Sequence, residues 1–188
     1  MTVHEGRVAD VPCRLLRVSF TGELSYELYV PADAGLALWE RLMAAGADLD
    51  VTPIGTEALH VLRAEKGFFV VGHDTDATVC PLDLGIGPML RLDKADFIGK
   101  RSLQRAELAR SGRQQFVGLL TDDPAVVVPE GSPVIEVPDA ARLGRPPVAA
   151  CGRVTSSYAS PTLGRSICLG LVAKDRKSTR LNSSHSQQ

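Results

Sequence analysis

The hydrophobic pattern changes near residue 112, and this change constrains the fold more than any other feature of the sequence. Before it, apolar residues recur at helical spacing in segments 33–46 and 55–67, and an amphipathic segment, 99–112, follows. After it, no long helical pattern occurs. Short segments rich in strand-forming residues take its place, separated by proline- and glycine-rich connectors: 114–120, 132–137, 152–158 and 165–173.

This pattern predicts an α+β fold in which an α+β region, residues 1–112, precedes an all-β region, residues 113–174. Within the first region, segments 12–20 and 25–30 alternate apolar and polar residues and predict an antiparallel pair. A further short helix is expected to begin at Pro81, because proline is favoured in the first turn of a helix.

Composition excludes several classes of function. The 21 basic and 22 acidic residues nearly balance, which argues against a nucleic-acid partner or a polybasic membrane anchor. No apolar run could cross a membrane, and MTVHEGRVAD lacks the layout of a signal peptide, so we expect a cytoplasmic protein. The four cysteines and four histidines are scattered, which predicts reduced thiols and no metal site. No G-x-G-x-x-G motif follows a strand, so NAD and flavin are not assigned to these residues.

The turn between the two predicted strands carries a carboxylate, in the sequence Thr21-Gly22-Glu23. A surface turn would accept Asn, Asp or Gly at least as well as Glu. From the residues alone, Glu23 is therefore either a solvated turn residue or a group that binds a ligand.

Several ordered segments resemble the aminomethyltransferase fold family. They are VSFTGELSYELYVP, TPIGTEALHVLRAEKGFFVVGHDTDATVCPLDLGI, DFIGKRSL and GRVTSSYASPTLGRSICLGLV. This family includes the glycine-cleavage T proteins, dimethylglycine and sarcosine dehydrogenases, and the alpha subunits of heterotetrameric sarcosine oxidases. The segment LHVLRAEKGFFVVGHDTD is most similar to the sarcosine oxidase branch. The resemblance covers about residues 11–174 and implies a partial folate-binding domain, 1–112, followed by a truncated C-terminal β-barrel domain, 113–174.

The resemblance also implies a ligand, tetrahydrofolate, and residues that bind it. Glu23 matches the family glutamate that holds the pterin, whose ring N–H and exocyclic amine are two parallel donors that one carboxylate can accept. Arg63 occupies the position of an arginine at the folate pocket, although a helix-surface ion pair would also explain it. Tyr26 could pack against the pterin or belong to the core. His73, in a loop, is either a site residue or merely solvated.

The same resemblance implies that the chain is a fragment. The family's catalytic aspartate lies upstream of the hairpin, so no catalytic residue is assigned here. The parent would be a sarcosine oxidase alpha subunit that works with other subunits, with flavin and NAD confined to those subunits or to absent regions. A glycine-cleavage T protein or a dimethylglycine dehydrogenase is the alternative. A non-enzymatic folate-binding protein of iron–sulfur assembly is less well supported, because Phe68 stands where that branch has a cysteine.

The last residues, 175–188, show no hydrophobic periodicity. They are expected to be disordered and to be a sequencing artefact. The stretch DRKSTRLNSSH, residues 175–185, is the translation of a widely used short-read sequencing adapter. We therefore assign no function to this segment.

Amplification of the locus from source DNA, sequenced across codon 174, is expected to show a different continuation. A genomic sequence that encodes DRKSTRLNSSH would contradict this expectation.

Overall fold

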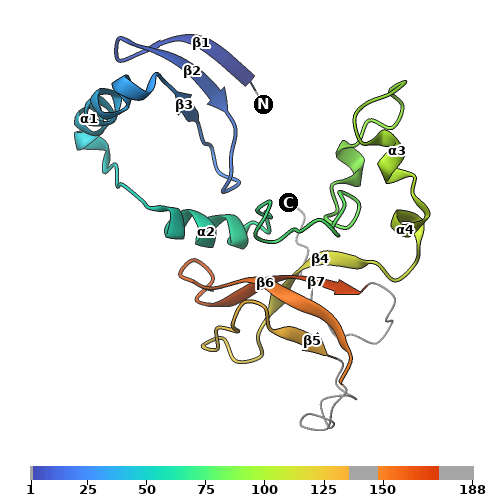
Figure 1. Ribbon diagram of the computed structural model, residues 1–188. Helices are drawn as coiled ribbons and strands as arrows, with labels where there is room; N and C mark the ends of the chain where they lie inside the picture. The colour runs from blue at the N-terminus through green and yellow to red at the C-terminus, as the bar shows by residue number, and fades with distance from the viewer. Residues whose placement is uncertain (1, 136–147, 174–188) are drawn as a thin grey trace. The chain divides into compact units, whose positions relative to one another are not determined.

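The computed structural model describes residues 2–135 and 148–173, apart from the side chain of Ala109. The contacts within the chain separate two units, Met1–Lys66 and Gly67–Gln188, and each is described by itself (Figure 1). Both helices and antiparallel strands are present, which confirms the predicted α+β class. The artefact expected at residues 175–188 lies outside the described residues.

The first unit begins with a three-stranded antiparallel sheet in the order β1-β2-β3. Its strands are β1 (Thr2–Val8), β2 (Val11–Arg17) and β3 (Glu27–Tyr29). The pairing of β2 with β3 confirms the predicted antiparallel pair, but it is limited to three residue pairs, centred on Leu15 and Leu28. The strand β1 was not predicted. It is exposed along most of its length, and its two-residue turn, Ala9-Asp10, adopts positive φ without glycine or asparagine.

Two helices follow the sheet, α1 (Gly35–Ala45) and α2 (Thr56–Glu65), with 3₁₀ turns at Ala32–Ala34 and Ala47–Leu49. Helix α1 buries Leu38 and ends at Gly46, whose N–H donates to the carbonyl of Leu42 over 3.0 Å. The buried residues of helix α2 are Arg63 and Ala64, at 0% and 5% exposure.

The second unit contains an open four-stranded antiparallel sheet in the order β4-β7-β6-β5. Its strands are β4 (Gln114–Leu120), β5 (Pro133–Ile135), β6 (Ala150–Ser160) and β7 (Arg165–Ala173). The core gathers on the two central strands, where Leu171 is 0% exposed and Leu169 is 3% exposed. The described strands form no closed barrel.

The segment 67–113, which precedes β4 in the second unit, holds less helix than expected. The turn at Pro81 leads only to a 3₁₀ turn, Gly87–Met89, in place of the predicted helix. The amphipathic segment 99–112 forms two short helices, α3 (Lys100–Leu103) and α4 (Ala106–Ala109). The break between them follows from Arg105, whose ψ of 139° is extended.

A β-bulge in β6 joins the start of this segment to the sheet. Val154 pairs with Gly170 and Ser156 with Leu169, so Thr155 is an extra residue. The bulge allows two successive hydroxyls to donate to one carboxylate oxygen, Asp74 Oδ1, over 2.6 Å from Thr155 and 2.5 Å from Ser156. The Val70 N–H donates to Asp74 Oδ2 over 2.8 Å, which forms a tight loop. Asp74 is 1% exposed, and these donors help to satisfy its buried carboxylate.

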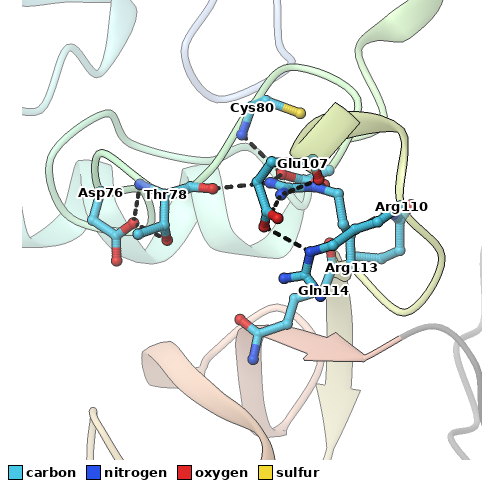
Figure 2. A network of polar contacts seen from close by, with 9 residues as sticks. Asp76, Thr78, Cys80, Glu107, Arg110, Arg113 and Gln114 are labelled. Carbon is cyan, nitrogen blue, oxygen red and sulfur yellow. Dashed lines mark hydrogen bonds and ion pairs between the residues drawn. The ribbon is translucent and has the colours of Figure 1, made fainter. Parts of the chain in front are cut away.

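A second buried carboxylate, Asp83, anchors the other end of the segment at the start of β4. Arg113 Nε donates to Asp83 Oδ1 over 2.8 Å, and Arg113 Nη2 donates to Asp83 Oδ2. Figure 2 shows Arg113 in a network of polar contacts that includes Thr78 and Cys80. The Cys80 N–H donates to Asp83 Oδ2 over 2.8 Å, and the Thr78 carbonyl accepts from Arg113 over 2.9 Å. Burial favours the neutral acid, but the hydrogen bonds from Arg113 and Cys80 outweigh it and lower the pKa of Asp83.

We predict that the Asp83–Arg113 pair makes the second unit sensitive to acid. A carboxyl with a lowered folded-state pKa stabilises fully above its unfolded-state pKa, about 3.9 for Asp, and this stabilisation is lost as the pH falls through the folded-state value. Asp83→Asn is expected to destabilise the unit by about 3 kcal/mol near neutral pH, because it leaves Arg113 without its carboxylate. Hydrogen–deuterium exchange of β6 and β7 amides, corrected for intrinsic rates, measures both effects.

The matched control for this experiment is Asp93→Asn, because Asp93 pairs with Arg91 over 2.8 Å on the surface of the same unit. The side chains of that pair are 66% and 72% exposed, so its loss is expected to change stability much less than the loss of the buried pair. Equal effects of the two substitutions would show that burial of Asp83 does not set its contribution.

Candidate functional site

The Thr21-Gly22-Glu23 turn presents its carboxylate to solvent and is shaped by glycine. Gly22 has a φ of +81°, a conformation that residues with a Cβ rarely adopt. The Glu23 side chain is 73% exposed, and its Oε1 lies 3.1 Å from Lys66 Nζ. The second oxygen, Oε2, has no ion-pair partner among the described residues. The carboxylate can therefore accept further donors from a ligand.

Helix α2 supplies Arg63 and, three residues later, Lys66. Arg63 is 0% exposed, so its guanidinium lies in the interior and not on the surface of the helix. Its role in binding a ligand stays a prediction. Lys66 is the C-cap residue of α2, and Gly67, with a φ of +74°, ends the helix. The Glu23–Lys66 ion pair thus ties the Glu23 turn to the last turn of the helix that carries Arg63.

Tyr26 lies between the Glu23 turn and β3, outside regular structure, and is 52% exposed. Both interpretations of Tyr26, packing and contact with a ligand, stay predictions. An open groove on the sheet is lined in part by Cys13, Arg14 and Tyr29. It includes none of the three predicted site residues.

His73 belongs to the second unit, where its Nε2 lies 3.3 Å from Glu130 Oε1. The two side chains are 37% and 44% exposed, so this is a surface contact in which the histidine is not simply solvated. Within the described ranges, no group of three or more His, Cys, Asp or Glu side chains could hold a metal ion. The same residues include no helix with the length and apolarity needed to cross a bilayer.

Sequence reasoning missed Lys66 as a member of this site. The ion pair joins residues 23 and 66, which lie far apart in the chain, so no local sequence pattern predicts it. The one available signal is position, because a lysine directly before a helix-ending glycine stands at the negative end of the helix dipole. That position is common to many surface lysines, and only the structure places Glu23 beside it.

Two family models match the chain. The GCVT N-terminal domain matches residues 1–94, and the glycine cleavage T-protein C-terminal barrel domain matches residues 114–184. A solved structure, the glycine cleavage system aminomethyltransferase T from Bartonella henselae, shares the fold with a TM-score of 0.71 at 23% identity. That match covers 86% of this chain and 42% of the other.

Sequence comparison with curated proteins finds relatives of the same family. The chain is 44% identical over 168 residues to the sarcosine oxidase subunit alpha of Corynebacterium sp. (strain P-1). It is 35% identical over 179 residues to the aminomethyltransferase of Moorella thermoacetica. These matches cover 89% and 93% of this chain, but only 17% of the first relative and 44% of the second. The chain belongs to the glycine cleavage T-protein family.

Proposed function

We propose that this chain is the folate-binding part of a protein similar to a sarcosine oxidase alpha subunit. In this proposal the parent protein, an oxidoreductase with further subunits, demethylates sarcosine to glycine. The chain holds tetrahydrofolate, which captures the released one-carbon unit as 5,10-methylenetetrahydrofolate. The higher identity to the sarcosine oxidase subunit than to the aminomethyltransferase, 44% against 35%, favours this branch.

The observation that carries the proposal is the carboxylate of Glu23. It follows Gly22, whose φ is +81°, and one of its oxygens lies 3.1 Å from Lys66 Nζ while the other has no ion-pair partner among the described residues. A pterin presents a ring N–H beside an exocyclic amine, and a carboxylate accepts this pair of parallel donors in charge-assisted hydrogen bonds. Glu23 would therefore fix the orientation of the pterin ring.

The contribution of this chain to the reaction would be positioning. A bound folate whose ring nitrogens face the arriving one-carbon unit converts a bimolecular encounter into a local reaction. Glu23 would set the rotation of the ring, and Tyr26, half exposed and three residues later, could cover one of its faces. Arg63, buried in α2, would support the wall beside the turn.

A glycine-cleavage T protein or a dimethylglycine dehydrogenase remains the second candidate, because the aminomethyltransferase match covers 93% of this chain. Glu23 would bind the same ligand in either case. The amine substrate separates these candidates. Assays of the full-length gene product with sarcosine, with dimethylglycine and with the aminomethyl carrier of glycine cleavage therefore test the proposal against its alternative.

We predict that Glu23→Ala weakens tetrahydrofolate binding about 100-fold in the full-length gene product. Two charge-assisted hydrogen bonds, each contributing roughly 1.5–3 kcal/mol, are lost, and about 3 kcal/mol corresponds to that factor. The fold is expected to persist because the side chain is 73% exposed. Isothermal titration calorimetry measures the affinity.

The matched control for Glu23→Ala is Glu27→Ala. Glu27 is an exposed glutamate four residues later, at the start of β3, and it accepts a hydrogen bond from Tyr29 over 2.6 Å. Its removal is expected to leave folate affinity unchanged. Unchanged affinity in Glu23→Ala would contradict the assignment of Glu23, and equal losses in both variants would point to a general effect on the sheet.

We also predict that the 188-residue chain expressed by itself self-associates and is inactive. Ten large apolar residues of the first unit are more than a third exposed, and surfaces of this kind normally have a partner. They are Val3, Leu24, Tyr26, Tyr29, Leu36, Trp39, Leu42, Leu49, Val51 and Ile54. Analytical ultracentrifugation is expected to show association that grows with concentration.

Trp39 reports directly on this surface, because it is the one tryptophan of the sequence and is 51% exposed. Its emission should move to the blue as the concentration of the 188-residue chain rises, because association covers the side chain. A monodisperse chain that captures formaldehyde in the presence of tetrahydrofolate would show that the part is complete by itself.

A further inference from the structure

We infer that Lys66 is a positioning residue for Glu23 and a determinant of selectivity for ligands that carry the amine of the pterin edge. This inference rests on the proposed function, because it takes Glu23 as the group that accepts hydrogen bonds from the ligand. The ion pair itself, with 3.1 Å between Lys66 Nζ and Glu23 Oε1, is the starting observation.

The backbone of Lys66 is well anchored. It caps α2, its N–H donates to the Ala64 carbonyl, and the left-handed Gly67 fixes the direction in which the chain leaves the helix. A cation at this end of a helix is favoured by the helix dipole. The backbone of Lys66 is therefore held at a defined place from which its ammonium reaches the carboxylate of Glu23, and this contact limits the rotamers of the glutamate.

The turn is also shaped around the lysine stem. A Cβ at Gly22 would lie 2.7, 2.8 and 2.9 Å from Cγ, Cδ and Cε of Lys66, closer than side-chain carbons approach one another. Gly22 thus serves two needs, its φ of +81° and the passage of the stem across the turn. A stem that lies against the backbone keeps the ammonium beside the carboxylate while the charged head remains in water.

The contact engages one carboxylate oxygen and leaves the other for a ligand. A carboxylate has about four acceptor positions, so an ammonium on Oε1 is compatible with two parallel donors on the outer edge of the group. Lys66 then restricts the rotation of the carboxylate plane. A ligand that supplies both donors gains from this restriction, while a ligand that lacks the exocyclic amine gains little.

The test compares Lys66→Met with Lys66→Arg in the full-length gene product. The probes are tetrahydrofolate and its 2-desamino-2-methyl analogue, which lacks the exocyclic amine. Because an exposed ion pair contributes at most about 1 kcal/mol, Lys66→Met is expected to weaken tetrahydrofolate about two- to fivefold and to leave the analogue unchanged. Lys66→Arg is expected to restore the selectivity, and added salt should reduce the difference between wild type and Lys66→Met.

Glu23→Gln in the same experiment separates the role of Lys66 from the proposed role of Glu23 in binding the pterin. In a Glu23→Gln background, Lys66→Met should have no further effect, because the pair no longer exists. A large loss in Glu23→Gln with none in Lys66→Met, or equal losses for both ligands in Lys66→Met, overturns the role of Lys66 while the proposed function stands. No loss in Glu23→Gln overturns the pterin assignment of Glu23, and this inference with it.

Discussion

A buried carboxylate, Asp74, determines how the segment after α2 joins the sheet of the second unit. A carboxyl group that is 1% exposed needs hydrogen-bond donors, and Thr155 and Ser156 of β6 supply two of them. They reach the same oxygen only because the bulge at Thr155 interrupts the alternation of the strand. Asp83, held by Arg113 at the start of β4, repeats this arrangement at the other end of the segment.

These two carboxylates explain why residues 67–113 group with the sheet, although their sequence pattern resembles the first region. The contacts divide the chain after Lys66, whereas the first family model extends to residue 94. A family model follows sequence similarity and contacts follow packing, so the two divisions describe different properties. The domain boundary predicted at residue 112 from the change of pattern stays a prediction.

Regular strands were the most predictable part of the fold. The segments 114–120 and 165–173 coincide with β4 and β7, because both are apolar, rich in β-branched and aromatic residues or leucine, and bounded by turn residues. The strand β1 gave no such signal, since it is exposed and its turn is Ala9-Asp10. The buried carboxylates could not be recognised from the sequence either, because the side chains that bond them, Arg113, Thr155 and Ser156, lie 30 to 82 residues away.

In the candidate site too, local sequence features could be predicted and a contact between distant residues could not. Glu23 and its glycine turn could be selected from a resemblance and a short motif, whereas the pairing with Lys66 depends on how α2 meets the turn. Under the proposed function, the strength of this pair also depends on its surroundings. Polypeptide that covers the exposed apolar residues of the first unit, such as Leu24 beside the turn, would lower the local dielectric constant. The attraction between Lys66 and Glu23 would then increase, so the constraint on the carboxylate would be tightest in the complete protein.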